Sequence, residues 1–151
     1  SINVYGLNRT ALVLERKREA LELQNDFFAL IVATKGYFRM RKMEAGLRSL
    51  EKQLANVPSQ GTRTELLQLT TALLHDAANA QQQALTEIEQ AIAFIRSKLT
   101  PDRPYLAMKR AIIEKEILQW TPMQEMLALG MFTEAHIRSL LDGKPLPIAE
   151  P

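Results

Sequence analysis

Hydrophobic residues recur every three or four positions along two very long stretches of the chain, residues 8–57 and residues 62–99. This spacing puts apolar side chains on one side of an α-helix, and over several heptads it is typical of coiled-coil seams. The stretches are separated by Pro58, Ser59, Gln60 and Gly61, where proline ends a helix and glycine permits a reversal. Because so short a connection makes neighbouring helices antiparallel, we predict an all-α fold in which residues 1–100 form an elongated antiparallel hairpin of two long coiled-coil-like helices.

The first predicted helix has two parts. Asn8 is the expected N-cap, and Leu14, Leu21 and Phe28 then follow at intervals of seven. Gly36 lies near the middle and is the expected place for any break, but we favour a continuous helix, because the apolar run at residues 27–33 has no second strand pattern to pair with. The second part has the three-and-four spacing of a coiled-coil seam, at Met40, Met43, Leu47, Leu50, Leu54 and Val57.

The second predicted helix begins at Thr62, which Glu65 completes as a capping box. Its middle, residues 77–84, is rich in alanine and glutamine and would let a neighbouring helix approach closely. A hairpin of two such helices leaves each helix apolar on more than one side, so we predict self-association through the seams at residues 40–57 and 85–99. The residues expected to carry it are Met40, Met43, Leu47, Leu50, Leu54, Leu85, Ile88, Ile92 and Ile95.

Residues 101–151 are predicted to form a small C-terminal helical subdomain of three short helices, packed on the hairpin or extending from it. The first helix would run from Pro104 to Trp120, and Thr121 would cap the second. Thr133 is the expected cap of the last helix, which Gly143 would end.

Composition narrows the possible environments more than the possible functions. The net charge of +2 is too small to indicate nucleic acid or anionic membrane by itself, and the absence of cysteine excludes disulfides and thiolate chemistry. The longest apolar run is too short to span a bilayer, so a membrane partner is not expected. The N-terminal residues lack a signal-peptide pattern, and we expect a cytoplasmic protein or a part of a larger assembly.

Basic residues concentrate in one segment of the first helix. Tyr37 and Phe38 lie among them, and cations beside aromatic rings are what phosphate backbones and exposed bases require. The alternative is that the cations cover the solvated outside of the helix while the rings pack inward. The candidate binding residues here are Lys35, Arg39, Arg41, Lys42 and Arg48.

An acidic stripe precedes this basic segment on the same predicted helix. Its carboxylates could pair with the basic segment of a second subunit, since complementary charges beside a seam select partners. Alternatively it is a solvated face, partly balanced by Arg16, Lys17 and Arg18. The stripe consists of Glu15, Glu19, Glu22 and Asp26.

Residues 125–147 carry the outline of a DNA-binding motif. Ala128 and Gly130 would lie in a first helix and turn, Ile137 and Leu140 in a second helix, and the segment closes with Asp-Gly-Lys-x-Leu-Pro. In this it resembles the helix-turn-helix of phage repressors and excisionase-type proteins. The resemblance implies that His136 and Arg138 contact DNA, although recognition helices normally present several donors to the major groove. The alternative is a small helical cap, in which Leu127, Met131, Ile137 and Leu140 form a mini-core with Trp120.

The sequence gives no support for catalysis. Di-metal helical bundles need Glu-x-x-His motifs, and neither His75 nor His136 belongs to one. No glycine-flanked serine turn or phosphate-binding loop occurs, so we expect no catalytic, metal or cofactor residues. We expect a non-enzymatic assembly, adaptor or structural protein that acts through self-association and another protein. The alternative is a nucleic-acid-binding regulator that dimerises through the hairpin and uses the helix-turn-helix-like segment or residues 35–52.

Overall fold

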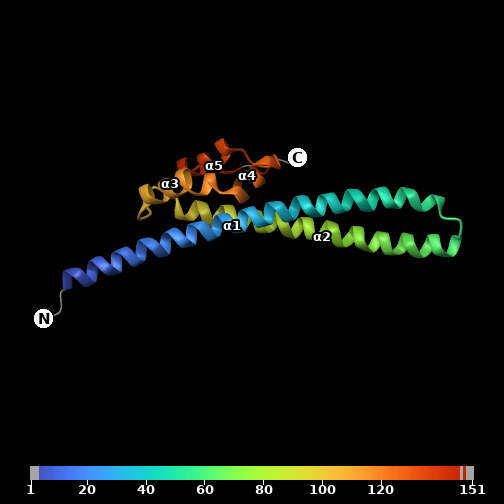
Figure 1. Ribbon diagram of the computed structural model, residues 1–151, viewed down its shortest axis with the longest axis horizontal. Coiled ribbons are helices and arrows are strands. Elements are labelled where there is room, and N and C mark those ends of the chain that lie inside the picture. Colours follow the sequence, from blue (N-terminus) through green and yellow to red (C-terminus); the bar gives the residue numbers. More distant parts are fainter. Residues whose placement is uncertain (1–3, 147, 149–151) are drawn as a thin grey trace. The chain divides into compact units, whose positions relative to one another are not determined.

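The computed structural model describes residues 4–146 and 148, and its described elements are all helical (Figure 1). The predicted all-α fold is therefore confirmed. Its elements are α1 (Val4–Gln53), the 3-10 turn η1 (Leu54–Asn56), α2 (Gln60–Lys98), α3 (Leu106–Lys115), η2 (Ile117–Gln119), α4 (Thr121–Ala128), α5 (Glu134–Ser139) and η3 (Leu140–Asp142). None of the described helices combines the length and the apolar composition that crossing a membrane requires.

The chain forms two compact units. The hairpin unit consists of Val32–Ile88, and the composite unit consists of Ser1–Ile31 together with Glu89–Pro151. This division passes through both long helices, whereas the sequence analysis placed a boundary near residue 100. The C-terminal helices thus share a core with the outer ends of α1 and α2.

The hairpin unit joins the second part of α1 to the first part of α2, which run side by side in Figure 1. The helix α1 continues through Gly36, as predicted. The predicted cap of α2 was wrong, because α2 begins two residues before Thr62 and Ser59 accepts a hydrogen bond from the Thr62 backbone N–H at 3.3 Å. Arg63 closes the turn by donating to the carbonyl of Val57 at 3.0 Å.

The core of the hairpin unit is narrow and built largely from small side chains. Small residues let the two helices approach closely but bury little apolar area. Tyr37 is its largest buried side chain on α1, at 7% exposure. The other buried residues are Ala33, Thr34, Leu54, Thr70, Leu74, Ala77, Ala84 and Ile88.

The composite unit has the larger core. Phe27 on α1 and Phe132 after α4 are fully buried, and the ring of Phe28 lies 4.8 Å from the ring of Trp120, between centroids. Burial of each large aliphatic side chain contributes about 1.5–3 kcal/mol, so this core supplies most of the unit's stability. It includes Leu23, Leu30, Ile31, Ile92, Ile95, Leu99, Ile113, Ile117, Leu118, Met123, Met126, Ile137 and Leu140.

The helix ends in the composite unit differ in part from the prediction. Asn8 lies inside α1 and is not its cap. The third helix ends at Lys115 instead of reaching Trp120, which itself occupies the N-cap position of α4 in place of Thr121. The cap at Thr133 is confirmed, since its side chain accepts from the His136 backbone N–H at 3.1 Å.

Candidate interaction surfaces

The basic segment lies on α1 in the hairpin unit, and part of its charge is already engaged there. Arg41 lies 5.9 Å above the centre of the Tyr37 ring, and Arg48 lies 3.7 Å from the carboxylate of Glu51. Lys35 also takes part in an interaction within the chain. Arg39, Lys42 and Arg48 are exposed, so cationic surface remains available to an acidic partner.

The aromatic residues of this segment do not form an open stacking platform. Tyr37 is buried against α2, and Phe38 is half-buried with its ring edge-on to Tyr37 at 5.6 Å. Stacking of a nucleic-acid base requires an exposed ring face. The arrangement therefore matches the alternative in which the rings pack inward and the cations cover the outside.

The two C-terminal residues expected to contact DNA have structural roles in the composite unit. The ring nitrogen Nδ1 of His136 accepts from the Thr133 backbone N–H at 3.3 Å, which completes a capping box. Arg138 pairs with Glu114 at 3.0 Å and with Glu134 at 2.8 Å. These contacts hold α5 in place, and those of Arg138 occupy guanidinium donors that base recognition would need.

The apolar residues of the alternative helical cap are largely buried, whereas Trp120 is half-buried and packs on Phe28. Met131, Ile137 and Leu140 are at most 1% exposed, and Leu127 is half-buried. Gly130 makes the turn before α5 with a φ of 87°, a conformation that glycine adopts without the strain of a Cβ. The turn and the core account for the apolar and glycine positions on which the resemblance rests.

The acidic stripe finds its partners within the composite unit. Arg18 pairs with Glu15 and, at 2.8 Å, with Glu22, and the Arg18 hydrogen bond holds the pKa of Glu15 below its usual value. Lys98 of α2 pairs with Asp26. The Arg18 pairs lie within α1, whereas the Asp26 pair joins α1 to α2.

Lys109 forms the most unusual polar contact, and the sequence analysis missed it. Its side chain is 1% exposed, and its Nζ lies 2.7 Å from the carboxylate of Glu19 and donates to the backbone carbonyl of Lys98 at 3.2 Å. A hollow of about 200 Å³ beside it is also lined by Glu22 and Arg103. Because Lys109 has both an ion partner and a hydrogen-bond acceptor, its charge is satisfied, and the arrangement joins α3 to both long helices.

The nine residues predicted to mediate self-association separate into different environments. Leu54, Ile88, Ile92 and Ile95 are buried within the chain, so they stabilise the two units rather than contact a second copy. Met40, Leu47 and Leu85 are half-buried. Met43 and Leu50 are exposed, at 50% and 43%.

Met43 and Leu50 belong to an exposed apolar surface on the hairpin unit. They lie four residues before Leu47 and Leu54, which face α2, just as Leu66 and Leu73 lie four residues before the buried Thr70 and Ala77. In an antiparallel pair the same offset points to the same side of both helices. We call this surface the hairpin face, and it consists of Met43, Leu50, Leu66, Leu69 and Leu73.

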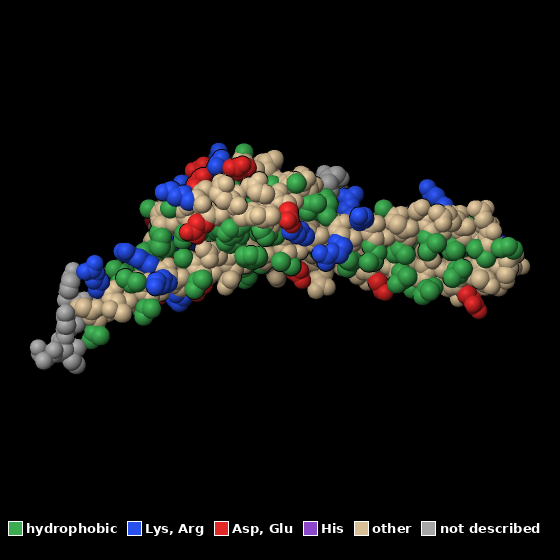
Figure 2. Space-filling model, in the orientation of Figure 1, with side chains coloured by type: hydrophobic (Ala, Val, Ile, Leu, Met, Phe, Trp, Pro, Cys, Tyr) green, Lys and Arg blue, Asp and Glu red, His purple; other side chains and the backbone are tan. Residues whose placement is uncertain are grey.

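Figure 2 shows hydrophobic side chains gathered in a band along the hairpin. The members of the hairpin face are 38–58% exposed. Single exposed apolar residues are ordinary, but a contiguous group of large ones marks an interaction surface.

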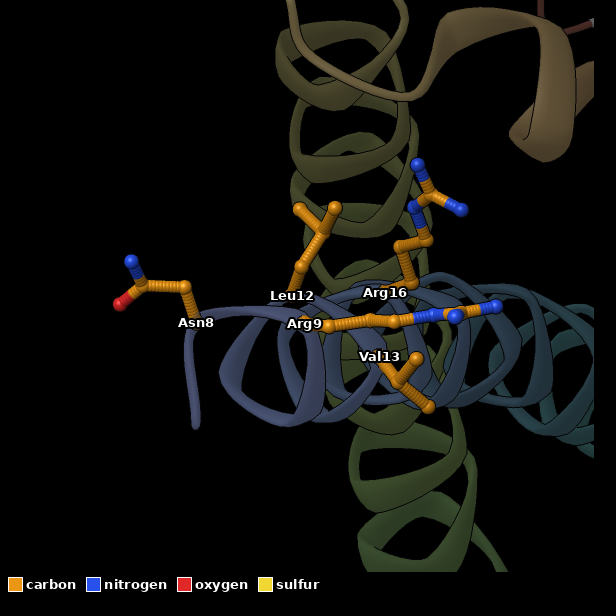
Figure 3. A pocket seen from close by; sticks show the side chains of 5 residues that line it. All are labelled: Asn8, Arg9, Leu12, Val13 and Arg16. Carbon is orange, nitrogen blue, oxygen red and sulfur yellow. The ribbon is translucent and has the colours of Figure 1, made fainter. Parts of the chain in front are cut away.

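The first part of α1, in the composite unit, is a second exposed region. A hollow of about 570 Å³ is lined by Asn8, Arg9, Leu12, Val13 and Arg16. All five side chains come from α1 and fan outward from it, as Figure 3 shows. Among the described residues no second element contributes to the lining, so this is open surface along one helix rather than a binding pocket.

The described part of the chain also lacks the pattern of a metal site. Among residues 4–146 and 148, no group of three or more His, Asp or Glu side chains lies together as a metal ion would require. The chain matches no protein-family profile, no curated protein and no solved structure. The functional argument therefore rests on the surfaces described above.

Proposed function

We propose that the protein is a non-enzymatic assembly or adaptor protein that self-associates and acts through protein–protein contacts. The hairpin face is the observation that carries this proposal. Five large apolar side chains from both helices are exposed on one side of a unit whose own core is narrow.

Covering the hairpin face with a second copy would supply burial that the hairpin lacks. Full burial of an exposed leucine contributes about 1.5–3 kcal/mol, and since these leucines are 38–58% exposed, each would gain roughly half of that. A two-helix unit whose core is built largely from small side chains has limited other apolar area to stabilise it, so association and stability of the hairpin unit are expected to rise together.

Sedimentation at micromolar concentration tests the proposal. The native chain should sediment as a dimer or a larger assembly, and the double variant Leu50→Glu/Leu73→Glu should weaken this association by placing charge in the hairpin face. The matched control is Gln68→Glu/Gln82→Glu, which adds the same charge at exposed polar positions of α2. A native chain that sediments as a compact monomer at this concentration would refute the proposal.

The second candidate function is nucleic-acid binding by a regulator that dimerises, and the exposed cations Arg39, Lys42 and Arg48 are the observation that favours it. It requires binding that weakens steeply with salt, because phosphate contacts release counterions. A gel-shift titration of duplex and single-stranded DNA at low salt discriminates it, with the variant Arg39→Glu/Lys42→Glu as the test of the site. Absence of any shift for the native chain eliminates this function.

A further inference from the structure

The first part of α1 is a helix with no covering element along several turns. Every side chain from residue 7 to residue 14 is exposed, although Leu7, Leu12, Val13 and Leu14 are large and apolar. Helices gain most of their stability from packing an apolar side, and short unpacked helical segments are marginal in water. A packing partner on its apolar side would therefore stabilise this segment.

One side of this segment has the pattern of a coiled-coil seam. Leu7, Leu14 and Leu21 follow one another at intervals of seven and are 58%, 61% and 59% exposed. Val4, Ala11, Arg18 and Asn25 lie three residues before or four residues after them, on the same side of the helix. We call these seven residues the outer seam.

The outer seam faces away from the core of the composite unit. Leu14 and Leu21 lie nine residues before the buried Leu23 and Leu30, which is about two and a half turns and so the opposite side of the helix. Leu12, which lines the hollow of Figure 3, lies two residues before Leu14, slightly over half a turn away, and so on another side of the helix. The contacts within residues 4–146 and 148 therefore leave the seam open.

We propose that the outer seam pairs with the outer seam of a second copy of this chain, as a parallel two-stranded coiled coil in register. This inference rests on the proposed self-association and assigns it a surface separate from the hairpin face. Leucines take the d positions, which in parallel dimers favour two strands, and Val4, Ala11, Arg18 and Asn25 take the a positions. A polar residue such as Asn25 at an a position fixes register at some cost in stability.

The charges beside the seam select the parallel orientation. Lys17 occupies a g position, and Glu15 and Glu22 occupy e positions. In a parallel dimer each g position faces the e position of the next heptad on the other helix, which puts Lys17 opposite Glu22 of the second copy. An antiparallel dimer would bring e positions together and set Glu15 against Glu22, two like charges.

The arginine within the seam is neutralised by residues of its own helix. Arg18 pairs with Glu15 and Glu22, and these contacts raise its pKa further above its usual value. With its charge balanced in this way, Arg18 can lie at an a position opposite its counterpart without a net repulsion between the two helices.

Cysteine cross-linking tests both the surface and the orientation, since the chain contains no cysteine of its own. The variants Leu7→Cys and Leu21→Cys should each form disulfide-linked dimers under mild oxidation roughly tenfold faster than Val13→Cys, because a disulfide needs Cα atoms within about 7 Å. Val13 is exposed on the other side of α1 and is the matched control. Equal rates for the three variants would show that the outer seam is not the contact surface. If a mixture of Leu7→Cys and Leu21→Cys forms mixed dimers faster than either variant alone forms dimers, the parallel orientation is wrong.

Sedimentation of Leu14→Asp separates this inference from the proposed function. Leu14→Asp should raise the dissociation constant about tenfold or more, whereas Leu12→Asp, the same substitution off the seam, should leave it within about twofold. If the native chain associates and Leu14→Asp does not weaken it, the outer seam is wrong while self-association through the hairpin face stands. If the native chain is monomeric, both proposals fail.

Discussion

Removing the charge of Glu19 should destabilise the composite unit more than removing its partner Lys109. The variant Glu19→Gln leaves the Lys109 ammonium at 1% exposure with neutral acceptors in place of an ionic partner: the new amide oxygen and the backbone carbonyl of Lys98. The variant Lys109→Met leaves the Glu19 carboxylate, whose side chain is 18% exposed and lies 3.7 Å from Arg18. The unpaired charge is thus fully buried in the first variant, whereas in the second it is partly exposed and has a cation nearby.

The size of the difference follows from this asymmetry. Removing one member of a buried ion pair costs about 3–5 kcal/mol, and the partial exposure of Glu19 places Glu19→Gln near 3 kcal/mol. For Lys109→Met we expect a loss of about 1 kcal/mol or less, because methionine fills the space of the lysine chain without needing a partner. Glu114→Gln, which removes a surface pair with Arg138, should cost under about 1 kcal/mol and serves as the control.

Urea denaturation followed by tryptophan fluorescence measures these losses. Trp120 is the chain's single tryptophan and packs on Phe28 within the composite unit, so its emission reports on that unit. The reasoning about Lys109 is refuted if Glu19→Gln loses no more free energy of unfolding than Lys109→Met.

Three further predictions concern local structure in the composite unit. Gly143→Ala should lower its free energy of unfolding by about 1 kcal/mol in the same urea experiment, because the φ of 73° strains any residue with a Cβ even though the space around it is open; an unchanged midpoint would contradict this. Thr133→Ala should cost about 1 kcal/mol by removing the side-chain acceptor of the His136 backbone N–H, and a Thr133→Ser variant should retain most of it. Arg18→Gln should raise the pKa of Glu15 toward its usual value in an NMR titration, since the Arg18 hydrogen bond is the main cause of the lowering. Because that pKa is lowered in the folded chain, the contribution of the pair to stability is present above the usual glutamate pKa and is lost as the pH falls through the folded value; a Glu15 titration identical in both proteins would refute the assignment.

The hairpin was predictable because its signals are local. Pro58 lies in the turn between the two long helices, and the heptad spacing on both sides needs no knowledge of distant contacts. Helix ends were harder to predict where two residues that could cap the same helix lie close together in the sequence. Ser59 precedes Thr62 by three residues and caps α2 first, whereas Thr133 has no rival nearby and was predicted correctly.

Which side of each seam faces inward could not be read from spacing alone. Met43 and Leu54 belong to the same three-and-four pattern, which predicts the same environment for both. In the structure, however, Leu54 is buried and Met43 is half-exposed. The choice depends on the partner helix, where Ala77 and Ala84 are the buried positions, and on α1 Tyr37 is buried too. Lys109 had no sequence signal at all, because its burial depends on Glu19, ninety residues earlier in the chain.

The division of the chain has a consequence for its synthesis. The hairpin unit is contiguous in sequence, so the whole unit can fold as soon as Ile88 has left the ribosome. The composite unit must wait, because Leu23 and Phe27 at the start of its core pack with residues that lie beyond Glu89. Until then the apolar side of nascent α1 has no partner in the chain. Early closure of the hairpin shortens the chain length that separates the two halves of the composite unit. A variant that weakens the turn at Ser59 is therefore expected to slow the folding of the C-terminal helices, although Ser59 lies outside their unit.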